Sequence, residues 1–231
     1  PPGSRPCDKG GSCGVPGLIA VAQSTQGSVQ NVEMIARSQI ESALSQSDIA
    51  FWAHSGTGVF QTGAGDADFP ISYVASDNVL GGRMAARALA KAIGEKGKVY
   101  IANVKPGIST TDQREEGFKL EIANWKDIEV LETQFNDDDA NKAAAQFQAV
   151  LGRVPDLAGV FGANLFSAAG AANGAKQAGV AGKVKMAGFD APESIVAQLK
   201  DGTFELTIAQ HPAEIGYFGL AAAHAFVTGN P

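Results

Sequence analysis

Short apolar segments alternate with helical patterns through most of this chain, and that alternation constrains its fold more than any other feature. Five segments from residue 99 onward have the apolar or period-2 character of β-strands, and each but the last is followed by a helical pattern. They are residues 99–104, 129–134, 157–163, 183–187 and 204–208. This order is typical of a doubly wound parallel sheet with helices on both faces. We therefore expect an α/β fold.

Two further helical patterns precede the first of these strands. The sequence SDN at residues 76–78 is a capping signal, and Leu80 and Met84 then fall along one face of the helix that follows. Residues 31–45 have weaker helical spacing. The rest of residues 1–58 is turn-rich or dominated by Ser and Gln, and it predicts little structure.

Polar side chains stand at or just beyond the carboxyl ends of the predicted strands. In an open parallel sheet those ends lie along one edge, where loops and helix N-termini converge and ligands bind. Taken singly, Asp190 could only cap a helix and Gln210 could be a solvated loop residue. Several such positions together favour a binding crevice. The side chains that we expect on this rim are Arg114, Asp138, Asn164, Asp190 and Gln210.

Arg114 is unusual because the sequence places it in the first turn of its predicted helix. The N-terminal end of the helix dipole is positive, so cations are normally found at the opposite end. We therefore expect Arg114 to have a function or a carboxylate partner. The alternative is a solvated surface arginine.

The residue types on this rim suit a ligand covered with hydroxyl groups. A hydroxyl both donates and accepts, so carboxylates and amides can satisfy it while an arginine donates from a fork. Asp138 and Asp190 could instead form the carboxylate pair of a glycosidase. They lie on different loops, and no nucleophile–base pair accompanies them. We therefore expect a binding protein rather than an enzyme.

Composition argues against several other partners. The formal net charge is -6 without a compensating basic cluster, which disfavours DNA or RNA, and the apolar runs are too short to span a membrane. No glycine-rich segment has the spacing of a nucleotide-binding loop, and His54, His211 and His224 are too scattered for a metal site. We expect no cofactor and no metal. Cys7 and Cys13 could close a small disulfide loop in an oxidising compartment.

Five segments occur in an order that is characteristic of one protein family: ISYVASDNVLGGRMAARALA, STTDQREEGFK, AGVFGANLFSAAGA, GKVKMAGFDAPE and ELTIAQHPAEIGYFG. Together they resemble periplasmic sugar-binding proteins of the ribose-binding type, the substrate-capturing components of ABC importers. The resemblance covers about residues 59–231. It implies two doubly wound α/β lobes joined by a hinge, which close on a sugar or polyol held between them. It also implies a periplasmic monomer that delivers its ligand to a membrane permease.

The resemblance further implies boundaries and roles. The first lobe would comprise residues 1–76 with 210–231, and the second lobe residues 77–209. The hinge crossings would lie at residues 76–77 and 210–211. The positions expected to contact the ligand are Arg114, Asn164, Asp190, Gln210, Asp138 and Gln61.

Several positions depart from the family pattern. Leu165 follows Asn164 where the family usually has an acidic residue, and the loop of Asp138 lacks the aromatic side chain that stacks on the sugar in ribose binders. A polyol or a sugar other than ribose is therefore a candidate ligand. Residues 1–58 match none of the first-lobe pattern, so we expect an incomplete first lobe. A diverged lobe and a segment read out of frame are the two explanations.

A second class of protein shares this fold, namely the ligand-sensing domain of LacI-type transcription regulators. It would need an N-terminal helix-turn-helix with basic residues, whereas residues 1–58 contain only Arg5, Lys9 and Arg37. We therefore favour the importer component. A carbohydrate-processing enzyme is a further alternative.

Overall fold

The computed structural model describes residues 28–37, 39, 49, 53 and 74–229 of the chain. The chain divides into two compact units, residues 1–45 and 46–231. In the first unit the described residues form helix α1 (Ser28–Ala36), on which Val32 is buried. This helix begins before its predicted start at residue 31, and most of its predicted continuation lies outside the described residues.

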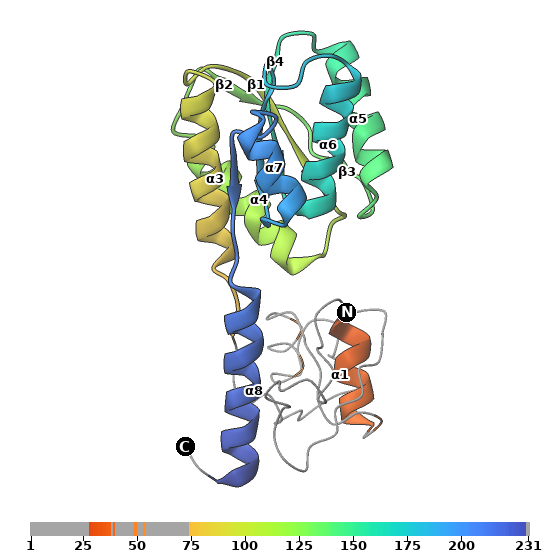
Figure 1. The fold of residues 1–231 in the computed structure, drawn as a ribbon, viewed down its shortest axis with the longest axis vertical. Helices are drawn as coiled ribbons and strands as arrows, with labels where there is room; N and C mark the ends of the chain where they lie inside the picture. Colours follow the sequence, from red (N-terminus) through yellow and green to blue (C-terminus); the bar gives the residue numbers. More distant parts are fainter. Residues whose placement is uncertain (1–27, 38, 40–48, 50–52, 54–73, 230–231) are drawn as a thin grey trace. The chain divides into compact units, whose positions relative to one another are not determined.

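A parallel sheet forms the centre of the second unit (Figure 1). Every pairing in it is parallel, in the order β2-β1-β4-β5-β6, and β3 pairs with β1 beyond the end of β2. The predicted α/β fold with a doubly wound parallel sheet is therefore confirmed for this part of the chain. The strands are β1 (Gly97–Asn103), β2 (Ile128–Val130), β3 (Gln134–Phe135), β4 (Leu157–Gly162), β5 (Lys185–Phe189) and β6 (Leu206–Ile208).

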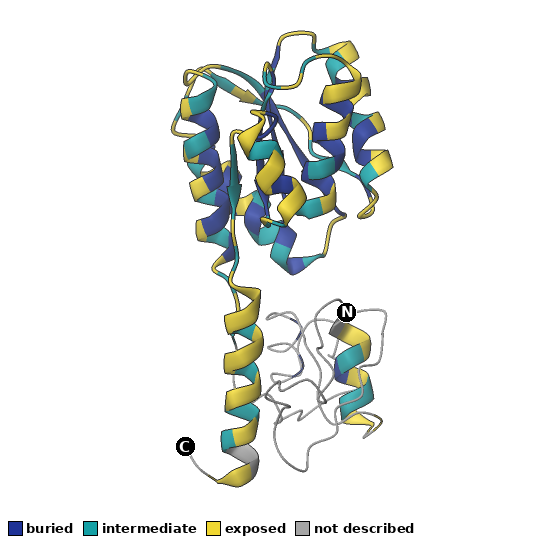
Figure 2. Cartoon of the chain, viewed as in Figure 1, coloured by how far each residue is buried: buried dark blue, intermediate teal, exposed yellow. Residues whose placement is uncertain are grey.

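Helices cover both faces of this sheet, and each is exposed on its outer side (Figure 2). These helices are α3 (Asn78–Ala92), α4 (Ser109–Ile122), α5 (Ala140–Arg153), α6 (Leu165–Gln177) and α7 (Glu193–Lys200). A further helix, α8 (Pro212–Thr228), follows β6. One buried cluster joins α3 and α4 to the sheet, and a second joins α5, α6 and α7 to it. Within the described part of the chain, no helix is long and apolar enough to cross a lipid bilayer.

The sequence identified the wrong face of α3 as its apolar face. Leu80 and Met84 are 47% and 49% exposed, while the buried face consists mainly of alanines around Leu89. Small residues let α3 lie close to its neighbours, and one glycine on each of α3 and α4 lets the two helices touch directly. A Cβ on Gly82 would overlap the carbonyl of Arg114, and one on Gly117 would overlap the carbonyl of Val79. This contact fixes the start of α3 against Arg114.

The predicted strand at residues 129–134 is also wrong in detail. It is divided into β2 and β3, and residues 131–133 between them belong to neither strand. Thr133 in this segment donates its hydroxyl to Glu115 of α4, at 2.7 Å. The break lies at the edge of the sheet, where β2 and β3 pair only with β1 in the described sheet.

Candidate functional site

Arg114 is the most heavily constrained side chain at the carboxyl edge of the sheet. It lies in the second turn of α4, one turn later than predicted, because the helix begins at Ser109. Its side chain is buried, and its Nε donates to Asn78 Oδ1 at 2.9 Å. One terminal nitrogen donates to the carbonyl of Ala163 at 2.9 Å, and the other to Gln210 Oε1 at 3.3 Å. The guanidinium also lies 4.1 Å from the centre of a phenyl ring, that of Phe189.

These contacts hold the guanidinium without a direct ion pair. Burial lowers the pKa of Arg114, and the nearby carboxylate of Asp190 offsets only part of this effect. An arginine keeps its proton across the physiological range, so the side chain remains a buried cation. Within the part of the chain that the structure describes, Arg114 hydrogen-bonds only to neutral groups. Such a cation is well placed to donate to an oxygen-rich ligand.

Gln210 connects Arg114 to two further segments. Its Oε1 accepts from Ser76 Oγ at 2.7 Å as well as from Arg114, and its Nε2 donates to Asp190 Oδ1 at 2.6 Å. Asp190 itself adopts a left-handed backbone conformation, with φ of 69°. Its backbone N–H donates to Ile208 O, and its carbonyl accepts from Thr207 Oγ1. The ends of β5 and β6 therefore hold Asp190 in an uncommon conformation beside Gln210.

Asp138 and Asn164 form a second polar pair on the same edge. Asn164 is the N-cap of α6: its Oδ1 accepts from the Ser167 N–H, and its Nδ2 donates to Asp138 Oδ1 at 2.6 Å. Asp138 is exposed and has φ of 63°, and its N–H donates to Asn136 Oδ1 at 3.0 Å. Asn164 therefore holds the carboxylate of Asp138 at the rim, and Asn136 holds its backbone.

The structure brings together the five described residues that the sequence assigned to one rim. Arg114, Asp190 and Gln210 form one hydrogen-bonded group, and Asp138 pairs with Asn164. The two groups are adjacent because Arg114 donates to the carbonyl of Ala163, the residue before Asn164. Gln61, the sixth predicted contact, lies outside the described residues, as do Cys7 and Cys13.

Two residues of this network were missed by sequence reasoning. Asn78 was identified only as part of a capping signal, and Phe189 only as part of a turn. In fact Asp77 caps α3, with its side chain accepting from the Leu80 N–H, which leaves Asn78 free for Arg114. The adjacent glycines 81 and 82 were the available signal, since they indicate a close backbone approach near the start of this helix.

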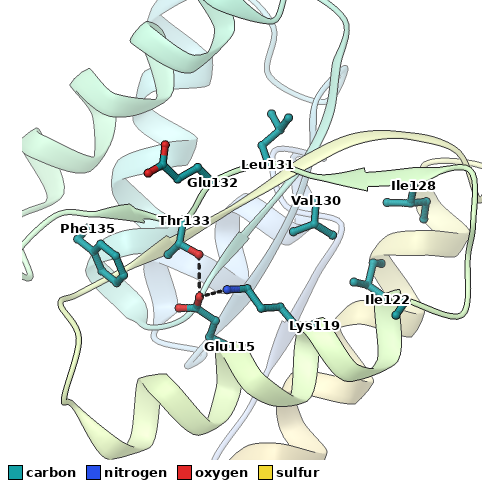
Figure 3. Close-up of a pocket in the computed structure, with 10 residues that line it drawn as sticks. Glu115, Lys119, Ile122, Ile128, Val130, Leu131, Glu132, Thr133 and Phe135 are labelled. Atoms are coloured by element: carbon teal, nitrogen blue, oxygen red, sulfur yellow. Dashed lines mark hydrogen bonds and ion pairs between the residues drawn. The ribbon is translucent and has the colours of Figure 1, made fainter.

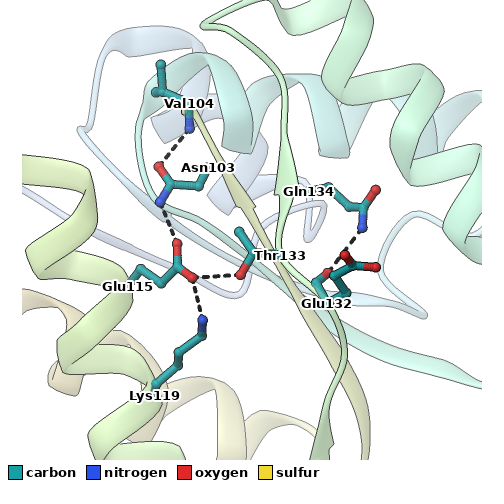
Figure 4. Close-up of polar contacts among 7 residues, drawn as sticks. All are labelled: Asn103, Val104, Glu115, Lys119, Glu132, Thr133 and Gln134. Atoms are coloured by element: carbon teal, nitrogen blue, oxygen red, sulfur yellow. Dashed lines mark hydrogen bonds and ion pairs between the residues drawn. The ribbon is translucent and has the colours of Figure 1, made fainter. Parts of the chain in front are cut away.

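A separate groove of about 580 Å³ lies between α4 and the β2–β3 edge (Figure 3). Glu115 lines this groove, and its carboxylate accepts from Lys119, Thr133 and Asn103 at 2.5, 2.7 and 2.5 Å (Figures 3 and 4). Burial alone would raise the pKa of Glu115, but these hydrogen bonds and the Lys119 charge outweigh it and hold the pKa below its ordinary value. The carboxylate is thus already occupied by protein partners, so the groove is the weaker candidate for a polar ligand.

Comparison with known proteins identifies the family of this chain. The family model of the periplasmic binding protein domain matches residues 21–231. The match begins well before residue 59, so the expectation that residues 1–58 match none of the family is wrong for residues 21–58.

Individual relatives match about two thirds of the chain. The ribose import binding protein of Salmonella typhimurium is 38% identical over 159 residues, which are 69% of this chain and 53% of the relative. The D-allose-binding periplasmic protein of Escherichia coli is 31% identical and is matched over 48% of its length. The chain therefore spans about half the length of these curated relatives.

Solved structures show the same relationship. An ABC transporter solute-binding protein from Agrobacterium vitis, bound with α-D-tagatopyranose, is 68% identical with a TM-score of 0.69, over 73% of this chain and 57% of that one. A solute-binding protein from Actinobacillus succinogenes with bound D-allose is 26% identical with a TM-score of 0.68, over 87% of this chain and 68% of that one. The chain belongs to the periplasmic binding protein family, and its relatives place it with the ribose type.

Proposed function

We propose that this chain is the substrate-binding component of a sugar or polyol ABC importer, and that it captures one small polyhydroxylated molecule at the carboxyl edge of its sheet. The observation that carries the proposal is the buried guanidinium of Arg114, which is held by neutral groups beside Asp190 and Gln210. A charge kept un-neutralised at the ligand-binding edge of a parallel sheet is suited to an oxygen-rich neutral ligand.

The hydrogen-bonding capacity of the rim defines what each side chain can offer. Among the described contacts, three of the five N–H groups of Arg114 have protein partners, so two remain for a ligand. The oxygen of Gln210 already accepts from Ser76 and Arg114, so this residue can offer only its second N–H. Asp190 keeps its second carboxylate oxygen.

Asn164 and Asp138 would serve the other end of the ligand. Asn164 keeps one amide N–H, and Asp138 keeps the carboxylate oxygen that does not face Asn164. The rim thus combines donors with acceptors, as the vicinal hydroxyls of a sugar require. Gln61 is proposed as a further contact from the other lobe.

A ketohexose in its pyranose form is the ligand that we expect. The protein that shares 68% identity with this chain was solved with α-D-tagatopyranose. The loop of Asp138 lacks the stacking aromatic side chain expected of ribose binders and contains carboxylates, which favours hydroxyl contacts over stacking. D-Tagatose is therefore the first compound to test, and D-ribose and D-allose follow from the other relatives.

The proposed setting follows from the family. We infer a periplasmic protein without catalytic activity or cofactor, acting as a monomer with a membrane permease as its partner and without nucleic acid. The two lobes would be residues 1–76 with 210–231 and residues 77–209, with Ser76 and Gln210 at the crossings. The Ser76–Gln210 hydrogen bond supports this assignment because it would link the two crossing segments directly.

Thermal unfolding of the chain with and without sugars tests the proposal. A ligand that binds only the folded state adds about 2.7 kcal/mol at a concentration of 100 times Kd, or roughly 5 to 10 °C in Tm for a protein of this size. We expect a saturable shift with D-tagatose and none with L-tagatose, the enantiomer that matches it in every bulk property. A cooperatively melting protein whose Tm responds to no pentose, hexose or polyol would contradict the proposal.

A further inference from the structure

Asn78 is a buried amide whose position neither helix capping nor core packing explains. It is the first residue of α3 and is 3% exposed, yet the capping hydrogen bond of this helix comes from Asp77. Its Oδ1 accepts from Arg114 Nε at 2.9 Å, and its Nδ2 faces Gln113 Oε1 at 3.5 Å. Burying an amide is costly unless it makes hydrogen bonds, so the contact with Arg114 must account for its presence.

The backbone around this pair is fixed. Gly82 touches the carbonyl of Arg114, and Gly117 touches the carbonyl of Val79, so α3 and α4 cannot slide past each other. With both backbones held, the remaining freedom of Arg114 lies in its side-chain torsions. The Phe189 ring below the guanidinium limits its tilt. A hydrogen bond to Nε then fixes its rotation within that plane.

The three hydrogen-bond partners of the guanidinium differ in how firmly the fold holds them. The carbonyl of Ala163 follows β4, and Asn78 is anchored on α3. Gln210 lies beyond β6, in a segment that the proposed function places at a hinge crossing, and it contacts Arg114 at the longest distance of the three, 3.3 Å. When a ligand competes for Gln210, Asn78 and Ala163 are the contacts that would still hold Arg114.

We infer that Asn78 is a positioning residue, which fixes the guanidinium of Arg114 so that its free N–H groups point at the sugar. This inference rests on the proposed function of the rim. The amide performs this task through its Oδ1, which accepts from Nε of Arg114. Asn78 does not need to contact the ligand.

The test compares Asn78→Leu, which has similar size but no acceptor, with Asn78→Asp, which keeps the acceptor oxygen. Isothermal titration of the full chain with D-tagatose gives the affinity of each. Because a hydrogen bond to a charged group is worth about 1.5–3 kcal/mol, we expect Asn78→Leu to weaken binding about 10- to 100-fold. Asn78→Asp should stay within a few-fold of the unsubstituted chain. If Asn78→Leu fails to fold, Asn78→Ser replaces it.

The same pair in an Arg114→Lys background shows whether Asn78 acts through the guanidinium. Lysine keeps the charge but has no Nε–H to orient, so Asn78→Leu should cause little further loss there. An equal loss in both backgrounds would overturn the inference. So would an Asn78→Leu variant that melts at a lower temperature but binds D-tagatose with unchanged affinity, because that is the outcome of a purely structural role.

A measurement made without ligand tests the role of Asn78 independently of the proposed function. In ¹⁵N NMR spectra the Nε–Hε signal of Arg114 should be protected from exchange in the unsubstituted chain and in Asn78→Asp, and lost in Asn78→Leu. Protection without binding of any tested sugar would mean that the geometry is right but the proposed function is wrong. Sugar binding with no difference between the three proteins would mean that the function stands and the role of Asn78 does not.

Discussion

Arg114 and Glu115 are consecutive residues of α4, and each has three hydrogen-bond partners, but they serve opposite purposes. Glu115 accepts from Lys119, Thr133 and Asn103, which include a cation, so its charge is compensated within the protein. Arg114 donates only to neutral groups, and the nearby carboxylate of Asp190 accepts from Gln210 instead, so the guanidinium has no direct ion pair among the described contacts. A directly paired charge strengthens the fold. A buried charge that is oriented without a direct ion pair costs stability that a ligand can return.

The two positions also differ in what surrounds them. The groove beside Glu115 has a volume of about 580 Å³, yet its central carboxylate already accepts three hydrogen bonds from the protein, of roughly four that it can accept. The Arg114 rim keeps unused donors and acceptors on several segments. Hydrogen-bonding capacity that the protein leaves unused, rather than hollow volume, therefore distinguishes the binding edge from the groove.

Replacing Arg114 by Met is the strongest test of this difference. The change removes the cation but keeps much of the apolar volume over Phe189. Two charge-assisted hydrogen bonds to the ligand would be lost, at about 1.5–3 kcal/mol each, so D-tagatose affinity should fall about 100-fold or more. Titration calorimetry measures this loss. The control is Arg87→Met, which removes an exposed arginine paired with Glu121 and should leave the affinity unchanged. Normal binding by Arg114→Met would contradict the site.

Replacing Glu115 by Gln should have the converse effect, on stability and not on binding. The pKa of Glu115 is lowered in the folded state, so the group stabilises the fold above its unfolded pKa of about 4.3, and that contribution is lost as the pH falls through the folded pKa. At pH 7, Glu115→Gln should therefore unfold at a lower urea concentration than the unsubstituted chain. The difference between the two urea midpoints should become smaller as the pH falls below about 4. A difference in urea midpoint that is independent of pH, or a weaker affinity of Glu115→Gln for sugar, would contradict a purely stabilising role of Glu115.

The contrast between Asp137 and Asp138 tests which residues belong to the rim. Both have left-handed backbone conformations, but Asp137 forms an ion pair with Lys142, whereas Asp138 accepts from Asn164. Loss of one ordinary hydrogen bond to the ligand costs about 0.5–1.5 kcal/mol, so Asp138→Ala should weaken binding about 2- to 10-fold. Asp137→Ala makes the same change one residue away and should leave the affinity intact. Equal effects of the two in calorimetry would remove Asp138 from the site.

The sequence was sufficient to predict the sheet and most of the rim. The strands can be identified from the sequence because a strand buried on both faces is apolar at nearly every position. The carboxyl ends of parallel strands lie at the same edge of the sheet whatever the details of the loops. Asn164, Asp190 and Gln210 could therefore be placed together from strand order alone. Their hydrogen bonds could not, because those depend on side-chain rotamers fixed by residues far apart in the chain.

The errors arose where tertiary contacts override a local pattern. The apolar face of α3 was misjudged because alanines and glycines, not Leu80 and Met84, meet the sheet and α4. The strand at residues 129–134 was predicted as continuous, but it is broken at residues 131–133, where the hydroxyl of Thr133 donates to Glu115. Asn78 was missed for the same reason: its partner is 36 residues away in sequence.

Tyr100 offers the smallest expected effect and a control for both positions on α4. It lies on β1 with its ring fully buried, and among the described residues its hydroxyl has no hydrogen-bond partner. Removing an unsatisfied buried hydroxyl returns its desolvation cost, so Tyr100→Phe should be neutral or more stable, by up to roughly 1 kcal/mol in urea unfolding at pH 7. D-Tagatose affinity should not change.

The pH dependence of Tyr100→Phe follows from burial alone. Burial raises the pKa of Tyr100 above its ordinary value, because the ionised phenol is excluded from water. Its contribution to stability is therefore constant below pH 10 and is lost as the pH rises above about 10, where the unfolded chain ionises first. The unsubstituted chain should lose stability faster than Tyr100→Phe between pH 10 and 11. Parallel curves would mean that the hydroxyl has a partner or reaches water. Faster loss of stability in the unsubstituted chain would mean that a buried polar group that is neither paired, like Glu115, nor oriented towards a ligand, like Arg114, is dispensable.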